Sequence, residues 1–337
     1  MTKIENKEKN NINLKLLTNI IPPQAPIEEE SNEMNQYSGI PQNIEQEGKF
    51  KGDPKMQKAY EVASKMNMKM IERENPEDLK YLKSVKESDI IIVTGSYDHG
   101  QVIFELSGIP YSLIGPNEVS SVELRDDQIL YINCPGNIEQ RSLERIKSFV
   151  FSGGMLVTTD WALKNVLEQI YPNIVRYNNR ATSDDVVRVV FEKVNDTFLK
   201  GLLDPKDEPL WWLEGSSYPI EILDKEKVTV LVSSKEMKEK YGESPIVITF
   251  EVGEGKIYHM TSHFYLQRTE TRSKRQKMGS ASYAAQKGIS MDDFTPQEVS
   301  AMKDVNVAQA EAAYTSVRSV SNMVMEQKKR VAKRSKK

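Results

Sequence analysis

The feature that most constrains this fold is an apolar segment that leads directly into a helix-like segment. Residues 155–158 have the character of a buried strand, and residues 164–170 continue with helical spacing. Many α/β enzymes place a nucleophilic serine at the bend between such a strand and its helix. In this chain the bend carries Asp160 and Trp161. The pattern therefore predicts an α/β fold but lacks the usual nucleophile.

Further apolar runs alternate with helical segments along the middle of the chain. Short, continuous apolar runs are typical of parallel strands that are buried on both faces. Their alternation with helices implies right-handed βαβ units. Later runs are joined by a tight Gly-Glu-Gly turn, which predicts antiparallel strands at the sheet edge. We therefore expect a parallel sheet flanked by helices, with added antiparallel edge strands. The parallel strands are expected at 90–94, 111–114, 129–133 and 155–158, and the antiparallel strands at 186–191, 228–232, 246–250 and 256–260.

The composition divides the chain into four parts. Residues 1–52 are polar and rich in Asn, Gln and Pro, so we expect them to be disordered. Residues 53–88 are expected to form two lead-in helices, because a capping Asp or Asn precedes Pro at each start. Residues 89–266 contain the α/β domain. Residues 267–337 are expected to form a linker, a long helix over 296–333 and a basic C-terminal tail.

Composition indicates the cellular compartment of the protein more than its activity. Of 337 residues, 38% are hydrophobic, below the roughly 45–50% of an average domain, which suggests polar segments outside the core. The single cysteine, Cys134, excludes an internal disulfide framework and a Cys-based zinc site, and it indicates a reducing compartment. The start resembles no signal peptide, and no apolar run approaches the ~18 residues of a membrane helix. We therefore expect no membrane insertion and a cytoplasmic location, or a nuclear one in a eukaryote.

Charge is unevenly distributed along the chain. Residues 268–337 hold 15 Lys and Arg against 7 Asp and Glu, a net charge of +8, and the remainder holds 31 against 42, a net charge of −11. Such asymmetry favours an anionic partner for the tail: a nucleic acid, an acidic protein face or a membrane surface. A solvated tail that keeps the protein soluble is the alternative. The candidate polyanion-binding residues are Lys328, Lys329, Arg330, Lys333 and Arg334.

Four kinds of segment carry a family resemblance: a strand with a Pro-Gly loop, a Gly-Gly pair before a strand, a short segment before the added strands, and a terminal hairpin. They lie at 129–137, 153–157, 197–202 and 245–262. Their order resembles the class I glutamine amidotransferase-like superfamily, nearest its trehalose-utilisation (ThuA-like) branch, over about half of the chain. The resemblance implies a flavodoxin-like fold. It also implies that Pro135 and Gly136 belong to an oxyanion-hole loop, and that His263 lies within one residue of the histidine closing the last strand.

The resemblance also implies what this chain lacks. Amidotransferases of this superfamily carry a cysteine at the strand–helix bend, where the helix N-terminus lowers the pKa of the attacking thiol. Asp160 or Trp161 occupies that place here, and Cys134 lies where the oxyanion loop begins. We therefore expect Cys134 to be a buried structural thiol and glutamine hydrolysis by the Cys-His route to be absent. The missing nucleophile argues against enzymatic activity and favours a pseudoenzyme.

Four polar residues are candidates for a site at the carboxyl ends of the strands, where open α/β sheets bind their ligands. Asp98 and His99 follow the first strand, Asp160 the fourth, and His263 the last. Asp160 and His263 would suit an acid–base pair, and Asp160, His263 and His99 would suit a divalent metal ion. The structural alternative is that Asp160 caps the following helix and that the histidines are satisfied structural residues.

Two functions follow from these observations. The first is a non-catalytic amidotransferase-like domain that acts as a protein-binding or scaffold module, with tails that recruit partners. The alternative is a hydrolase-type or metal-dependent enzyme that acts on a small polar substrate at the carboxyl ends of the strands. No P-loop, zinc-ligand spacing or kinase signature is present in the sequence, and we predict no cofactor. The expected partners are proteins, with an acidic or nucleic-acid partner for the C-terminal tail.

Overall fold

The computed structural model describes residues 54–202, 207–263, 265 and 269–336, which belong to one compact unit. The expected disordered segment 1–52 lies outside these residues. Helices α3 (Pro54–Glu74) and α4 (Pro76–Lys83) occupy the region where two lead-in helices were expected. Asn75 caps α4 by accepting a hydrogen bond from the backbone N–H of Glu77.

Eight strands form the central sheet. They are β1 (Ile90–Val93), β2 (Ser112–Ile114), β3 (Ile129–Ile132), β4 (Met155–Thr159), β7 (Val190–Phe191), β10 (Thr229–Ser233), β11 (Pro245–Val252) and β12 (Gly255–Met260). Their spatial order is β2-β1-β3-β4-β12-β11-β10-β7. The first five of these run parallel, and the remaining three continue as antiparallel pairs. The expected fold class is confirmed: a mostly parallel sheet flanked by helices, with antiparallel strands at one edge.

One strand lies in a different place from the one expected. The sequence predicted that β12 belongs to the antiparallel edge, but it pairs in parallel with β4 in the middle of the sheet. It is antiparallel only to β11, its partner in the hairpin. The register sets Met260 opposite Thr159, so the residues that follow β4 and β12 leave the sheet at the same edge.

Two small strand pairs accompany the central sheet. The predicted strand 186–191 is divided, because β6 (Asp185–Arg188) leaves the sheet and pairs with β8 (Leu210–Leu213). β8 is a strand that the sequence analysis did not predict. The second pair joins β5 (Val175–Tyr177) to β9 (Ile220–Ile222). Strand β8 matters for function, because the residue that follows it lies in the candidate site.

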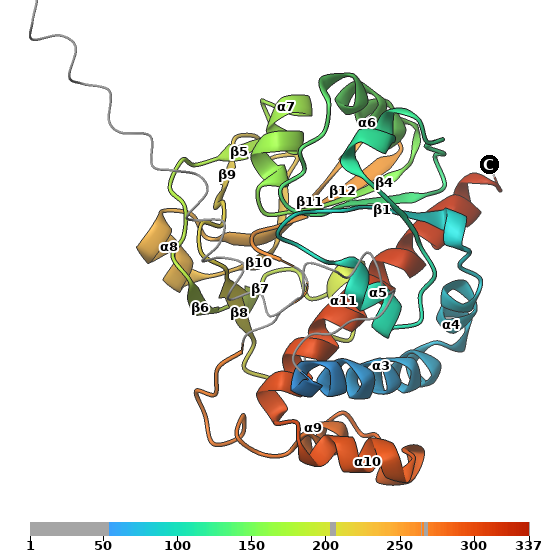
Figure 1. The fold of residues 1–337 in the computed structure, drawn as a ribbon, viewed down its shortest axis with the longest axis vertical. Coiled ribbons are helices and arrows are strands. Elements are labelled where there is room, and N and C mark those ends of the chain that lie inside the picture. The colour runs from blue at the N-terminus through green and yellow to red at the C-terminus, as the bar shows by residue number, and fades with distance from the viewer. Residues whose placement is uncertain (1–53, 203–206, 264, 266–268, 337) are drawn as a thin grey trace, which may run out of the picture. The chain divides into compact units, whose positions relative to one another are not determined.

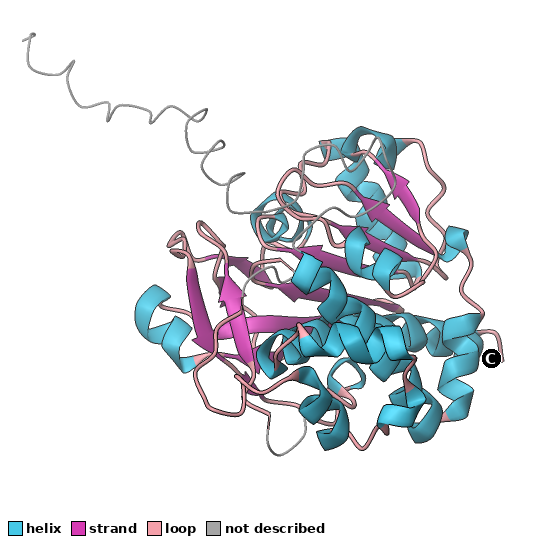
Figure 2. Cartoon of the chain, turned by 60° about the horizontal axis from the view of Figure 1, so that its bottom comes forward, coloured by secondary structure: helices cyan, strands magenta, loops and turns pink. Residues whose placement is uncertain are grey.

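Alternate side chains of the parallel strands enter two hydrophobic clusters, one on each face of the sheet. Ile90 and Ile92 belong to the first cluster, and Ile91 and Val93 to the second. Helices α3, α5 (Gln101–Leu106) and α11 (Val307–Arg334) cover the first face, and α6 (Gln140–Ser152) and α7 (Glu168–Ile170) cover the second (Figure 1). Figure 2 brings the helices of the first face forward. Burial on both faces explains why each strand is a continuous apolar run.

The C-terminal region contains two helices where one continuous helix over 296–333 was expected. α10 (Pro296–Lys303) ends before a short break, and α11 then runs to Arg334. Asn306 begins the second helix, because its side chain accepts a hydrogen bond from the backbone N–H of Gln309. α11 packs along α3, and most of its residues up to Gln327 are buried. It therefore belongs to the core.

Most basic residues at the end of α11 contact other parts of the chain. The charges of Lys328, Lys329 and Arg330 are paired with carboxylates, so a polyanion-binding role for this region stays a prediction. The contacts are Lys328 with Asp89 at 2.6 Å, Lys329 with Asp78 at 2.5 Å, Arg330 with Glu251 at 2.6 Å and Arg334 with the backbone carbonyl of Asp126 at 2.6 Å, whereas Lys333 is exposed.

Short elements complete the chain. They are α8 (Lys235–Tyr241), α9 (Ser280–Gln286), a π-helical turn (Leu163–Leu167) and 3₁₀ turns at Glu87–Asp89, Pro116–Ser120, Thr197–Leu199 and Met291–Asp293. Within the described ranges, no helix is both long and apolar enough to cross a bilayer.

Candidate functional site

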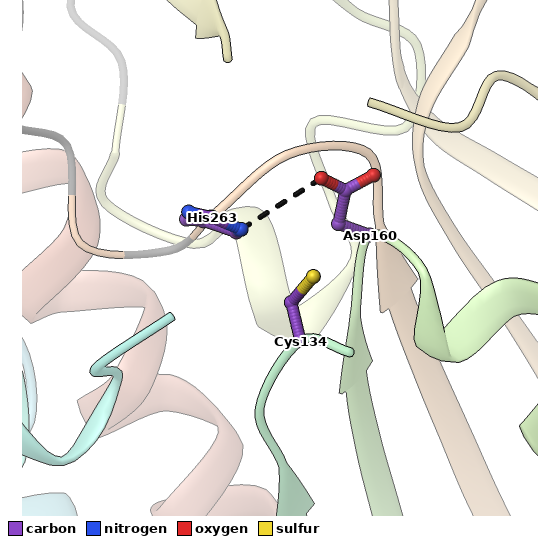
Figure 3. A group of neighbouring side chains, drawn as sticks. All are labelled: Cys134, Asp160 and His263. Carbon is purple, nitrogen blue, oxygen red and sulfur yellow. Dashed lines mark ion pairs between the residues drawn. The ribbon is translucent and has the colours of Figure 1, made fainter. Parts of the chain in front are cut away.

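Three buried side chains meet where the parallel strands end (Figure 3). Cys134 follows β3, Asp160 follows β4, and His263 follows β12. A sulfur, an oxygen and a nitrogen atom of these residues all lie within 4.8 Å of one another. None of the three residues is more than 4% exposed. The structure thus brings together two residues proposed from the sequence and adds Cys134 to them.

Asp160 occupies a strained turn between β4 and the helix that follows. Its φ of 45° lies in the left-handed region, which few residues other than Gly, Asn and Asp adopt. Its carboxylate accepts hydrogen bonds from the backbone N–H of Tyr218 at 2.7 Å and from the hydroxyl of Ser217 at 3.0 Å. The capping interpretation is therefore wrong, because Asp160 binds a distant loop rather than its own helix. A non-glycine residue at positive φ between strand and helix is the geometry of a nucleophile elbow.

His263 is held from one side and left unpaired on the other. Its Nδ1 forms an ion pair with Oε2 of Glu214, which directly follows β8. Its Nε2 lies 3.7 Å from the Asp160 carboxylate, and it has no hydrogen-bond partner among the described residues (Figure 3). The backbone N–H of Glu214 donates to the hydroxyl of Ser262, which ties the two segments together. The imidazole is thereby aimed at Asp160 and Cys134.

Glu214 was missed because its strand was missed. β8 pairs with β6 and not with the central sheet. It therefore lies outside the alternation of strands and helices from which the other strands were predicted. Cys134 could have been found, because its position after the third predicted strand puts it at the same edge as Asp160. The interpretation of Cys134 as a buried thiol agrees with its 1% exposure. The sequence analysis left Cys134 out of the candidate site, whereas the structure places it beside Asp160 and His263.

Burial governs the protonation of the group. It raises the pKa of the Cys134 thiol to about 12, and the neighbouring His263 and the Trp161 backbone N–H offset only part of this rise. It also raises the pKa of the Asp160 carboxyl to about 7, against the lowering effect of His263. Burial alone would lower the pKa of His263, but the carboxylates of Glu214 and Asp98 hold it well above its ordinary value. The environment therefore shifts every member of the group.

The other two proposed ligands lie differently. Asp98 is buried, and one of its oxygens accepts a hydrogen bond from the Thr159 hydroxyl at 2.7 Å. Its second oxygen has no hydrogen-bond partner within the described part of the chain. Asp98 thus adds negative charge beside His263. His99 is half-buried, and the three grouped side chains do not include it.

The Pro-Gly loop packs directly under the elbow. Pro135 and Gly136 are buried, and the Pro135 carbonyl accepts a hydrogen bond from the Asn165 side chain at 2.8 Å. A Cβ on Gly136, whose φ is 69°, would lie 2.8 Å from the Cβ of Ala162. Only glycine therefore allows this close approach. The oxyanion role of the loop stays a prediction.

Aromatic rings adjoin the group. Trp161 stacks on Tyr218 with ring centroids 5.4 Å apart and meets Tyr97 edge-on at 5.1 Å. Tyr218 in turn stacks on Tyr177 at 3.8 Å. The charge of Asp160 contributes, after burial, to raising the pKa of the Tyr218 phenol. These half-buried or buried rings connect the polar group with its surroundings.

Neither a protein-family model nor a curated protein matches this sequence. Among solved structures, the chain is similar to a β-galactosidase from Rahnella sp. R3, with 14% identity, a TM-score of 0.38 and coverage of 53% of this chain and 29% of that chain. It is also similar to a cytoplasmic protein from Salmonella typhimurium, with 12% identity, a TM-score of 0.38 and coverage of 52% and 88%. A third is a Bacteroides uniformis protein described as ThuA-like, with 11% identity, a TM-score of 0.36 and coverage of 53% and 84%. The chain spans less than a third of the β-galactosidases that it matches.

Proposed function

We propose that the α/β domain is a hydrolase-type enzyme that acts on a small polar substrate at Cys134, Asp160 and His263. The observation that supports this most is the imidazole of His263. Glu214 holds its Nδ1, and its buried Nε2 is aimed at Asp160 without a hydrogen bond to any described residue. An unpaired buried polar atom costs stability, and such costs are concentrated at functional sites.

The proposed reaction is hydrolysis: water attacks one atom of a polar bond of the substrate, that bond breaks, and the proton that the water gives up passes through Asp160 and His263 to the leaving group. Asp160 and His263 present an oxygen and a nitrogen 3.7 Å apart, a gap that is too long for a direct hydrogen bond. One water molecule or one substrate atom can contact both. Glu214 fixes the ring of His263, and the Tyr218 amide and Ser217 hydroxyl fix the carboxylate of Asp160. Two oriented polar atoms of this kind are what proton transfer to a bound molecule requires.

Access to this group requires movement, because all three side chains are buried. Trp161 and Tyr218 directly follow Asp160 and Ser217, are half-buried and stack on each other. We expect these two rings to move when a substrate enters. A small substrate needs the least displacement, which is why the proposal names a small substrate class.

The experiment is a hydrolysis screen of the purified full chain against small chromogenic esters, amides and phosphate monoesters. Asp160→Asn and His263→Gln are expected to reduce the rate by about 100-fold or more, the usual loss for a proton-transferring group. His99→Gln is the matched control and is expected to keep the wild-type rate, because His99 is outside the group. Circular dichroism checks that each variant folds.

Two results would contradict the proposal. One is hydrolysis that survives both Asp160→Asn and His263→Gln. The other is a folded wild-type chain that hydrolyses no compound of the panel.

Several predictions concern other parts of the molecule. The scaffold role, the recruitment of protein partners, the nucleic-acid contact and the cytoplasmic location stay predictions. So does the assignment to the ThuA-like branch. For the nucleic-acid contact, Lys328, Lys329 and Arg330 already form ion pairs with carboxylates of the chain, so a polyanion would have to displace these partners.

A further inference from the structure

We propose that Cys134, Asp160 and His263 bind one zinc ion. The inference concerns the site of the proposed hydrolysis: its catalytic meaning rests on that proposal, whereas the metal binding does not. A sulfur, a nitrogen and an oxygen ligand from the protein, with a fourth position left for water, is the pattern of a catalytic zinc site. The sequence argued against a Cys-based zinc site, but one thiolate suffices where His and Asp complete the set.

The distances suit one tetrahedral ion. Zinc binds nitrogen and oxygen at about 2.0–2.2 Å and sulfur at about 2.3 Å, so its ligands lie roughly 3.3–3.8 Å from one another. The Nε2 of His263 and the Oδ2 of Asp160 are 3.7 Å apart, and all three ligand atoms lie within 4.8 Å of one another. Small side-chain rotations would close the set around an ion.

Each of the three ligands already has the supporting contact that metal ligands usually have. Metal-binding histidines donate the other ring N–H to a carboxylate, as Nδ1 of His263 does to Glu214. The Asp160 carboxylate accepts two hydrogen bonds from the loop at 217–218. The backbone N–H of Cys134 donates to the Thr159 hydroxyl at 3.1 Å, which fixes the segment that carries the sulfur. These contacts would orient the ligands before the metal arrives.

The balance of buried charge points the same way. Asp98, Asp160 and Glu214 are all at most 9% exposed, and the carboxylates of Asp160 and Glu214 both approach the His263 imidazole. Burying several carboxylates beside one imidazole is costly unless a further positive charge compensates them. A divalent cation would supply that charge. The Nε2 of His263, which has no hydrogen-bond partner among the described residues, is an independent observation that favours a ligand here.

The donor set selects the kind of metal. Mg²⁺ and Ca²⁺ prefer oxygen ligands, whereas a thiolate with an imidazole suits zinc. Zinc bound by three protein ligands lowers the pKa of its water to about 7. That water would be the attacking group of the proposed hydrolysis, and Asp160 and His263 would then act as zinc ligands instead of transferring protons themselves. The Cys134 sulfur would then serve as a metal ligand rather than as a nucleophile.

The test is metal titration of the full chain after chelation, with Co²⁺ as the spectroscopic probe and Zn²⁺ as the competitor. One equivalent of Co²⁺ is expected to bind, with a thiolate-to-cobalt charge-transfer absorption that Zn²⁺ abolishes. Cys134→Ser is expected to remove that absorption, and His263→Gln to remove binding. Glu214→Gln is expected to weaken binding by about 10–100-fold. His99→Gln should bind as the wild type does.

The proposal would be overturned if the folded wild-type chain bound neither ion, or if Cys134→Ser kept the charge-transfer absorption. Reduced binding in His99→Gln would instead favour the ligand set Asp160, His263 and His99, and it too would overturn the proposal. The two proposals fail separately. Hydrolysis that resists chelation but is lost in Asp160→Asn would contradict the zinc proposal and support the proposed hydrolysis. Stoichiometric zinc binding without hydrolysis would support the zinc proposal and contradict the proposed hydrolysis.

Discussion

Two of the regions that bury charged side chains satisfy those charges in different ways. Where α11 packs on β12, the Lys256 ammonium donates to Glu326 at 2.8 Å, and Tyr258 donates to the second carboxylate oxygen at 2.5 Å. Each charge there has an opposite charge within hydrogen-bond distance. At the strand ends, by contrast, Asp160 and Glu214 share one imidazole, whose Nε2 has no hydrogen-bond partner among the described residues.

The difference separates a structural contact from a candidate functional group. A buried pair that is fully hydrogen-bonded requires no further molecule and joins a helix to the sheet. A group with more carboxylates than cations and an unpaired nitrogen is less stable than it could be, and shifted groups of this kind are concentrated at functional sites. Substitutions should therefore change mainly stability in the first region and mainly binding and activity in the second.

The largest stability effect is expected from Glu326→Leu. It leaves the Lys256 ammonium, whose side chain is 10% exposed, buried without its counter-charge. Removing one partner of a buried pair costs about 3–5 kcal/mol of unfolding free energy. Urea denaturation measures the loss. The double variant Lys256→Met with Glu326→Leu removes both charges and should recover most of it. A loss below about 1 kcal/mol in the single variant would contradict the structural role.

Glu311 on α11 is a buried carboxyl whose pKa is shifted, unlike the paired charges where α11 packs on β12. The pH dependence of stability tests its effect. Burial, reinforced by the charge of Asp207, raises the pKa of the Glu311 carboxyl to about 7. Because the folded pKa exceeds the unfolded value, its contribution to stability is complete below pH ~4.5 and is lost as pH rises through about 7. Glu311→Gln should remove this loss, worth up to about 3 kcal/mol.

The measurement is urea denaturation of wild type and Glu311→Gln at pH 5 and pH 8. The exposed Glu239 on α8 provides the matched control, Glu239→Gln. Equal pH dependence in wild type and Glu311→Gln would show that the burial of this carboxyl has no effect on stability.

Asp160 should separate backbone strain from chemistry. Ala tolerates a φ of 45° poorly, so Asp160→Ala should cost about 1–2 kcal/mol. Asn adopts this conformation more readily and keeps an oxygen for the Tyr218 N–H, so Asp160→Asn should unfold within about 1 kcal/mol of the wild type. Thermal or urea denaturation, run beside the hydrolysis and metal assays, distinguishes them. An Asn variant as unstable as the Ala variant would place Asp160 with the structural contacts.

The smallest effect is expected from Arg330→Gln at the end of α11. Its partner Glu251 is 59% exposed at the side chain, and exposed ion pairs contribute about 0–1 kcal/mol. The same variant can be tested for salt-dependent binding to a DNA duplex. A marked loss of such binding would support the polyanion-binding prediction, and unchanged or absent binding would count against it.

The parallel half of the fold was predictable because its signals are local. The strand expected at 129–133 is β3, Ile129–Ile132, and the strand expected at 155–158 is β4, Met155–Thr159. A short, continuous apolar run is sufficient for these elements. The break before α11 also had a local signal, because Asn306 and Gln309 form a second capping box.

The edge strands were harder, because their partners are distant in sequence. β12 carries the same apolar pattern whether it joins β4 or the sheet edge. β8 pairs with β6 across a long connection, so neither β8 nor the Glu214 that follows it could be placed from local pattern. Strand formation depends on which partner strands lie alongside, and the local sequence pattern does not identify those partners.

By itself, the sequence determined the α/β class, the strand–helix bend at Asp160 and the edge of the sheet where Asp98 and Asp160 would lie. These follow from hydrophobic periodicity and from the common direction of parallel strands. Only the tertiary structure decided that Asp160 accepts hydrogen bonds from a distant loop and that Cys134 and Glu214 join His263. Those contacts link segments far apart in the chain, and the register of β4 against β12 is what brings them within reach.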